Sequence, residues 1–163
     1  MGFRLHPFHQ SLRKRQREHP KYYFFDIGIQ RSLQKVAALP VVPGTYEFGN
    51  TFEHFIILEC QRLNSYLRKD FSFSYLQTHH DMEVDLVIER PRKKTILCEI
   101  KSTTIVKDED VATLKRIRND FPDFEYICLS LDVYEKNIEG VLCLPWLKGL
   151  EKIFSLAALP GVE

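Results

Sequence analysis

Two short runs in the middle of the chain carry acidic and basic side chains at a spacing that suits metal chemistry. Asp85 lies in the run EVDLVIE, and Glu99 and Lys101 lie in the run CEIKS. Polar and apolar residues alternate in both runs, which predicts two β-strands joined by a turn at residues 91–94. Side chains repeat every second residue along a strand, so Glu99 and Lys101 are expected on one face.

The connection between these strands leaves two registers open. Asp85 lies opposite Lys101 if the loop is short, and opposite Glu99 if the loop has about five residues, which is also a common hairpin length. Either register places Asp85 beside both Glu99 and Lys101, because cross-strand partners point the same way. We therefore expect two carboxylates and an ammonium group to lie within a few ångströms of one another.

Carboxylates in such a group are hard oxygen ligands that suit Mg²⁺ or Mn²⁺. A bound metal ion of this kind activates water, and the Lys101 ammonium can stabilise the charge that develops at phosphorus, which predicts phosphodiester hydrolysis. The alternative is an exposed sheet face whose cross-strand ion pairs contribute well under ~1 kcal/mol each. Val87 and Leu97 are expected on the same face, so burial beneath a helix, and with it a function, is favoured.

Glu53 is a third carboxylate that two interpretations explain equally well. Asn50 and Glu53 have the spacing of a capping box at the start of a helix that continues through Ile56 and Cys60. Alternatively, the start of this helix lies against the sheet, where Glu53 can join the other acids. The residues alone leave both interpretations open.

The remaining patterns predict a single domain of mixed α/β class. The chain has 163 residues, of which 44% are hydrophobic and 28% charged, as in an ordinary globular protein. No apolar run approaches the roughly 18 residues that span a bilayer, and no secretory signal is evident, so we expect a cytoplasmic protein. The four cysteines lie in apolar stretches without a CxxC pair and are predicted to be reduced core residues. The expected order is strand, helix, helix, three strands, helix, two strands and helix, which predicts a mixed sheet covered by helices.

The N-terminal segment is strongly basic. Residues 1–21 hold six Lys or Arg side chains and one acid, whereas the other 142 residues hold 17 basic and 21 acidic side chains. Residues 1–20 lack clear periodicity, so we predict a basic arm or linker with one short helix, followed by a domain over residues 21–163. Such an arm can contact phosphates, although a solvated tail or a connection to an upstream segment is the favoured interpretation.

Several motifs in a fixed order resemble a known family. The runs KYYFFDIG, GNTFEHFIILE, EVDLVIE, CEIKS and LPW resemble DUF4143, a domain at the C-terminal end of many prokaryotic AAA+-type ATPases. The strand motifs also resemble the PD-(D/E)xK superfamily, which implies a restriction-endonuclease-like mixed sheet flanked by helices. The resemblance implies a catalytic set of Glu53, Asp85, Glu99 and Lys101, in which the three carboxylates bind Mg²⁺ or Mn²⁺.

One position departs from the family pattern. The family often has Arg-Thr ahead of its EVD motif, and this chain has Gln77-Thr78, which puts a basic contact in doubt. His79 and His80 follow and are expected to be exposed loop residues. A P-loop is also not formed, because the run GTYEFGNT has the glycine spacing but no lysine.

The resemblance implies a DNA nuclease or nuclease-like domain that partners an AAA+-type ATPase module encoded upstream. A non-catalytic module that regulates or recruits for an ATPase is the main alternative, since a fold does not establish an activity. A plain nucleic-acid-binding domain that uses the basic arm ranks third. No membrane partner is expected, and the sequence leaves a homodimer open.

Overall fold

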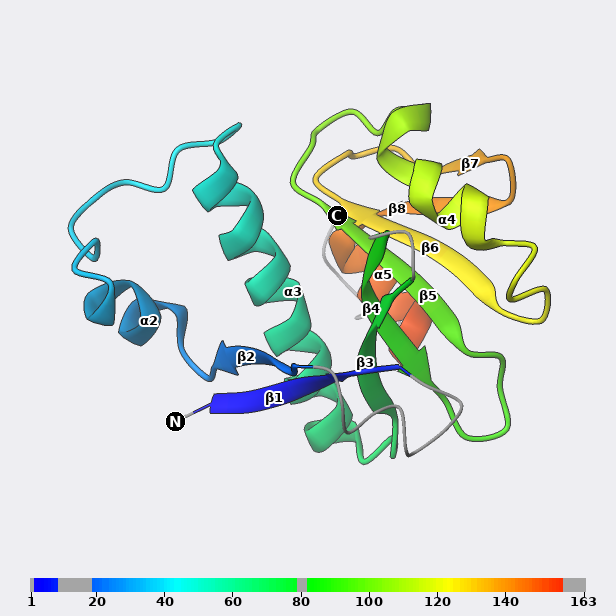
Figure 1. Ribbon diagram of the computed structural model, residues 1–163, viewed down its shortest axis with the longest axis horizontal. Coiled ribbons are helices and arrows are strands. Elements are labelled where there is room, and N and C mark those ends of the chain that lie inside the picture. The colour runs from blue at the N-terminus through cyan, green and yellow to red at the C-terminus, as the bar shows by residue number, and fades with distance from the viewer. Residues whose placement is uncertain (1, 9–18, 79–81, 157–163) are drawn as a thin grey trace.

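The computed structural model describes residues 2–8, 19–78 and 82–156. Within these residues, eight strands form one sheet in the order β2-β1-β3-β4-β5-β6-β8-β7 (Figure 1). Antiparallel pairs join β1 to β2, β3 to β4, β4 to β5 and β7 to β8, and parallel pairs join β1 to β3, β5 to β6 and β6 to β8. The mixed α/β class predicted from the sequence is confirmed.

The strands and helices alternate much as the sequence patterns predict. The strands are β1 (Gly2–Pro7), β2 (Lys21–Phe24), β3 (Ser72–Gln77), β4 (Glu83–Glu89), β5 (Ile96–Lys101), β6 (Glu125–Ser130), β7 (Lys136–Ile138) and β8 (Val141–Pro145). The helices are α2 (Ile27–Leu33), α3 (Tyr46–Leu67), α4 (Ala112–Ile117), which follows the 3-10 turn η1 (Asp108–Val111), and α5 (Trp146–Phe154). Among the described residues, no helix is long and apolar enough to cross a membrane.

Two hydrophobic clusters hold helices against the two faces of the sheet. On one face, α3 packs against β5, and α5 packs against α3, β6 and β8, through a cluster that includes Ile56, Ile153 and Leu86. On the other face, α4 packs through Leu114 against Leu97 and its neighbours. Each fully buried aliphatic side chain in these clusters contributes about 1.5–3 kcal/mol relative to exposure. The strands β4 and β5 are therefore covered on both sides.

The four cysteines lie inside this core. All are buried and none forms a disulfide, which confirms the prediction of free core residues.

The helix α3 begins earlier than predicted. Its N-cap is Thr45, whose hydroxyl accepts a hydrogen bond from the backbone N–H of Phe48 at 3.2 Å. Asn50 and Glu53 therefore lie within the helix, and the capping-box interpretation of Glu53 is wrong. Asn50 follows the breakers Pro43 and Gly44 and has a side chain that suits an N-cap. Thr45, which comes directly after these breakers, takes that role instead.

The beginning of the chain also differs from the prediction. Gly2–Pro7 was expected within a basic arm, but it forms β1, which lies between β2 and β3. Its pairing with both neighbours is a long-range interaction that local periodicity does not reveal. Residues 9–18, which hold most of the basic residues of the predicted arm, and His79 and His80 lie outside the described residues.

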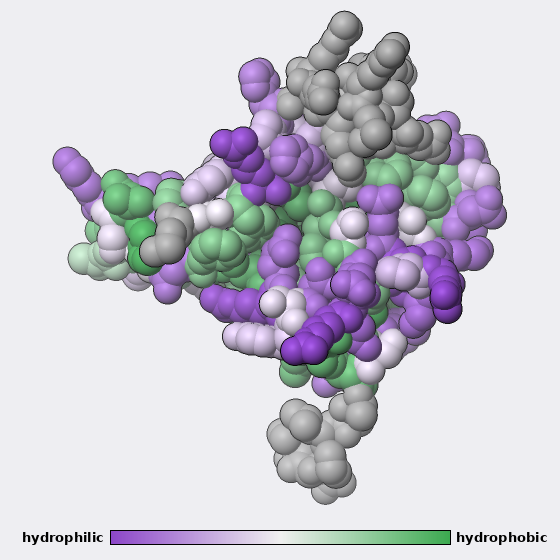
Figure 2. All heavy atoms as spheres, turned by 90° about the horizontal axis from the view of Figure 1, so that it is seen from below, coloured by the Kyte–Doolittle hydropathy of each residue, from purple (hydrophilic) through white to green (hydrophobic). Residues whose placement is uncertain are grey.

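A lobe formed by β2, α2 and the following loop projects from the body (Figure 1). Seen from below, apolar side chains are visible on this lobe and in the hollow beside it (Figure 2). The exposed apolar residues here are Tyr22, Phe25, Ile29, Leu33, Leu39 and Val42. Apart from Tyr23 of β2, which is buried in the core, the lobe thus buries little apolar surface, and polar contacts help to fix its position.

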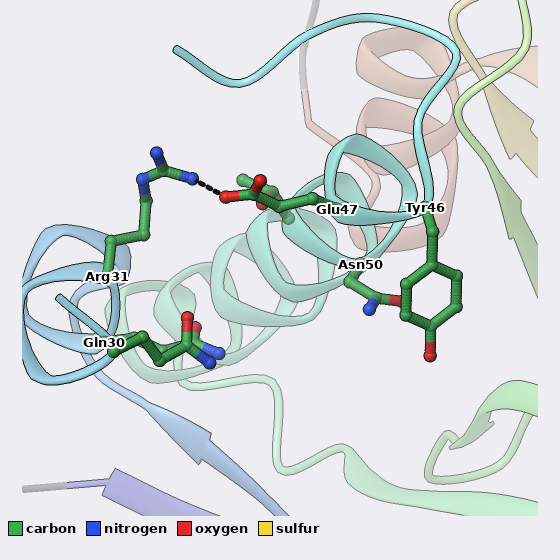
Figure 3. A pocket seen from close by; sticks show the side chains of 7 residues that line it. Gln30, Arg31, Tyr46, Glu47 and Asn50 are labelled. Atoms are coloured by element: carbon green, nitrogen blue, oxygen red, sulfur yellow. Dashed lines mark hydrogen bonds and ion pairs between the residues drawn. The ribbon is translucent and has the colours of Figure 1, made fainter. Parts of the chain in front are cut away.

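Arg31 makes one of several polar contacts between the lobe and α3, and His54 of α3 makes two others, to Gln30 and to the Phe24 carbonyl oxygen. Its guanidinium pairs with Glu47 and donates to the carbonyl oxygens of Val36, at 2.9 Å, and Leu39. Arg31 and Glu47 also line a pocket of about 190 Å³ between α2 and α3, where they point toward each other (Figure 3). Because the guanidinium is already committed to these partners, we assign this pocket a structural role.

Candidate functional site

A β-bulge in β4 places the central aspartate. Ser74 pairs with Val87 and Leu76 pairs with Val84, so two steps along β3 match three steps along β4. The extra residue lies in the segment that contains Asp85. Bulges of this kind re-aim side chains and interrupt pairing, and they recur beside functional sites. The bulge also explains why Val84 packs in the same cluster as Val87, rather than on the opposite face as strict alternation predicts.

The ladder between β4 and β5 ends at this bulge. It runs from Ile88 paired with Ile96 to Leu86 paired with Cys98. Continued by one residue, this register places Asp85 opposite Glu99, which is the second of the two registers open from the sequence. Instead of a backbone pair, the Asp85 carboxylate accepts the N–H of Ile100 at 2.7 Å. The Asp85 carboxylate thus takes the place of a backbone carbonyl as the acceptor for the Ile100 N–H, and this hydrogen bond fixes its position.

Glu99 is a buried acid with an incomplete set of partners. Its side chain is only 2% exposed, and it shares the sheet face of Leu97, which α4 covers. Among the described residues, its Oε2 atom has no hydrogen-bond partner, and its ion-pair partner is the Lys101 Nζ at 3.6 Å. A buried carboxylate oxygen without a hydrogen bond is costly, since it has lost its hydration without replacement.

Burial and charge shift the proton affinities of this pair. Burial, and then the charge of Asp85, raises the pKa of Glu99 from 4.5 to about 9. Burial lowers the pKa of Lys101, but the carboxylates of Glu99 and Asp85 outweigh it, and the pKa is raised. The Lys101 side chain is 35% exposed, so its ammonium lies at the edge of the site, where solvent or a ligand can reach it.

Glu53 belongs to a neighbouring polar group. It lies on α3, and its carboxylate accepts a hydrogen bond from the Tyr23 hydroxyl at 2.7 Å. Burial, and then the charge of Asp85, raises the pKa of Glu53. Asp85 therefore acts electrostatically on both Glu53 and Glu99. Across the ranges that the structure describes, however, no three His, Cys, Asp or Glu side chains are close enough to share a metal ion.

The arrangement still fits a divalent cation at the Asp85–Glu99 pair. The charge of Asp85 on the adjacent strand raises the pKa of Glu99, and the buried Glu99 Oε2 atom has no hydrogen bond among the described residues, with the Lys101 Nζ 3.6 Å away. A small oxygen-seeking cation held by Asp85 and Glu99 would supply further positive charge and a partner for this oxygen, and one or two protein carboxylates are often enough for Mg²⁺. The pair thus fits the metal ions predicted from the sequence, whereas Glu53 has partners of its own.

A comparison with models of known protein families identifies the family of this chain. The model of the family described as "Domain of unknown function (DUF4143)" matches residues 48–147, which is more than half of the chain. The chain belongs to the DUF4143 family. The matched range holds Glu53, Asp85, Glu99 and Lys101. Neither a curated protein nor a solved structure gave a match.

Two further residues of this DUF4143 domain lie beside Glu53, and the sequence patterns did not identify either of them. Lys21 of β2 pairs with Glu83, lies 3.8 Å from a Glu53 oxygen, and stacks over the Tyr75 ring at 5.2 Å. Burial lowers the pKa of Lys21, but its hydrogen bond to Glu83 and the charge of Glu53 outweigh it, and the pKa is raised.

Tyr23 is the second missed residue. Burial, and then the charge of Glu53, raises the pKa of its hydroxyl, which therefore stays protonated and donates to Glu53. Alternation in β2 already places Lys21 and Tyr23 on one face, which was a usable signal. The sequence does not show that β2 pairs with β1, or that this pairing places Tyr23 against Glu53 of α3.

Proposed function

We propose that this DUF4143 domain is a PD-(D/E)xK-type, divalent-metal-dependent phosphodiester hydrolase that acts on DNA. The observation that carries the proposal is the buried Glu99 carboxylate, which lies beside Asp85 and has an oxygen without a hydrogen bond. Buried acids with strongly shifted pKa values that converge on an accessible lysine are typical of catalytic sites.

Each residue has a distinct part in the proposed reaction. Asp85 and Glu99 would hold Mg²⁺ or Mn²⁺, and the Ile100 N–H keeps the Asp85 carboxylate in place. When bound, the metal ion polarises the phosphodiester and lowers the pKa of a water molecule. Lys101 stabilises the negative charge that builds up on the phosphoryl oxygens, because its ammonium is reachable from solvent. Glu53 orients the two polar side chains beside it, the Tyr23 hydroxyl and the Lys21 ammonium.

Cleavage of DNA tests the proposal directly. Supercoiled plasmid DNA is incubated with the protein and Mn²⁺, and nicked and linear products are measured. We expect cleavage that a chelator stops and that Asp85→Asn and Lys101→Met each reduce by about 100-fold or more. Glu135→Gln, a change at an exposed acid outside the site, should leave the rate unchanged. Cleavage that persists in both site variants would show that a contaminating nuclease is responsible and would refute the proposal.

A second candidate is a non-catalytic module that partners an ATPase. It is favoured by the separation of Glu53 from the Asp85–Glu99 pair and by the pKa of about 9 at Glu99, which opposes metal binding near neutral pH. Calorimetric titration with Mn²⁺ distinguishes the two. Binding that Asp85→Asn abolishes supports the hydrolase, whereas no binding up to millimolar Mn²⁺ at pH 8 supports the non-catalytic module.

A further inference from the structure

A second pocket lies at the opposite end of β5 and β6 from the acidic site. It has a volume of about 350 Å³ and lies where the β4–β5 turn, the segment before β6, the β7–β8 turn and α5 meet. Its lining residues are Lys94, Arg118, Pro122, Phe124, Glu125, Tyr126, Ile127, Gly140, Leu142 and Lys152. From Lys94 to Glu99 the chain advances five residues, or roughly 17 Å along an extended strand, so this pocket is separate from the acids.

The pocket carries a surplus of positive charge. Lys94, Arg118 and Lys152 line it, and Glu125 is the one acid in its lining. The carboxylate of Glu125 already pairs with Arg90 at 3.0 Å. Within the described part of the chain, the ammonium groups of Lys94 and Lys152 form no ion pair, so their charge is compensated only by solvent. Three cations around one concavity attract an anion with more than one negative charge.

One of these cations is held in place by the backbone. The Arg118 Nη1 atom donates to the carbonyl oxygen of Glu139 at 2.7 Å. Gly140 has a φ of +89° and lies directly under the guanidinium, where a Cβ atom would come within 2.4 Å of Nη1. The glycine thus makes room for the guanidinium at the rim of the pocket. A guanidinium held in this way needs little further ordering to bind an oxyanion.

The other walls are apolar. Phe124, Ile127 and Leu142 contribute carbon surface, and the Tyr126 hydroxyl is turned to the backbone carbonyl of Phe121 at 2.5 Å. A site with convergent cations and an apolar wall suits a ligand that has a phosphate and a flat ring system. We propose that this pocket binds the phosphate group of a nucleotide, with the base or sugar against the apolar wall. The inference does not depend on the proposed hydrolase activity.

Titration of the full-length chain, ¹⁵N-labelled and followed by amide chemical shifts, tests this inference. The probes are inorganic phosphate, AMP and a single-stranded oligonucleotide of about six nucleotides, at an ionic strength of roughly 0.15 M. We expect saturable shifts at Gly140 and Ile127. The variant Lys94→Gln/Lys152→Gln should weaken binding by about tenfold, because two of the three cations are lost.

A matched control is available on the same two elements. Lys93 and Lys148 are exposed lysines in the same turn and the same helix, and neither lines the pocket. The pair Lys93→Gln/Lys148→Gln removes the same net charge and should keep the affinity within about twofold.

The outcomes separate the source of the phosphate. Binding of inorganic phosphate as tight as that of AMP means that the phosphate group alone is recognised. Tighter binding of AMP assigns a contact to the apolar wall, and binding of the oligonucleotide alone assigns the pocket to a strand. The inference is overturned if no probe gives saturable shifts at Gly140 and Ile127, or if both double variants weaken binding equally.

Discussion

The two ends of β5 and β6 concentrate opposite charges, but they do so in different surroundings. At the carboxyl end, Glu99 is 2% exposed on the face that α4 covers, Asp85 lies beside it, and Lys101 lies at the solvent-accessible edge. At the amino end, Lys94 and Lys152 are exposed to solvent around an open pocket. A charge exposed to water is screened and has little effect on the free energy of unfolding, whereas a buried charge changes the pKa of its neighbours and lowers stability. The acidic end is therefore suited to chemistry, and the basic end to reversible binding.

Replacing Glu99 by glutamine should have the largest effect on stability. The folded pKa of about 9 lies above the ordinary 4.5, so the folded protein holds a proton that the unfolded chain releases between these values. Stability is thus expected to fall as pH rises from about 5 to 9, and Glu99→Gln should remove that loss. We expect the variant to be more stable than the wild type by several kcal/mol at pH 8, since each pH unit in this window costs the wild type up to ~1.4 kcal/mol, but not at pH 4.5, in urea denaturation.

The exposed acid Glu135 provides the matched control for this measurement. Glu135→Gln should leave the pH dependence of the free energy of unfolding as in the wild type. Equal stability of the wild type and Glu99→Gln at both pH values would show that Glu99 ionises normally, and the contrast between the two ends would disappear.

Removal of the Tyr23 hydroxyl should have an intermediate effect. The hydroxyl is buried and donates to Glu53 at 2.7 Å, so Tyr23→Phe should lower the free energy of unfolding by about 1 kcal/mol. It should also raise the pKa of Glu53 further, because that hydrogen bond favours the carboxylate. Thermal denaturation measures the first effect, and a carboxyl ¹³C titration measures the second. Tyr66→Phe, at a tyrosine that is 80% exposed, should change neither quantity.

Neutralising the basic end should have the smallest effect. Lys94→Gln/Lys152→Gln is expected to change the free energy of unfolding by less than about 0.5 kcal/mol, because both side chains are exposed and unpaired within the described chain. Urea denaturation checks this at pH 7. A loss comparable to that in Tyr23→Phe would mean that the lysines support the fold, which would narrow the difference between the two ends.

Local patterns predicted most of the elements but not the long-range pairings. The alternation in β4 and β5 placed Asp85 opposite Glu99 in one of the two possible registers. The apolar neighbours of Glu99 predicted that a helix covers this face of the sheet. β1 was missed because only its pairing with β2 and β3 specifies it. The alternative role of Glu53 as a cap was wrong because Thr45 begins the helix one turn earlier. The pairing of the carboxylates with Lys21 and Tyr23 depends on tertiary contacts that no short-range pattern contains.

The bulge in β4 makes the site depend on the number of residues as well as on their identity. Deleting Val84 would restore a regular ladder with β3, yet it would rotate Asp85 away from Glu99 and release the Ile100 N–H. A relative that keeps every acid but lacks this single residue would therefore have the motif without the site. A one-codon deletion can thus dismantle the proposed site while it leaves all the recognisable side chains in place.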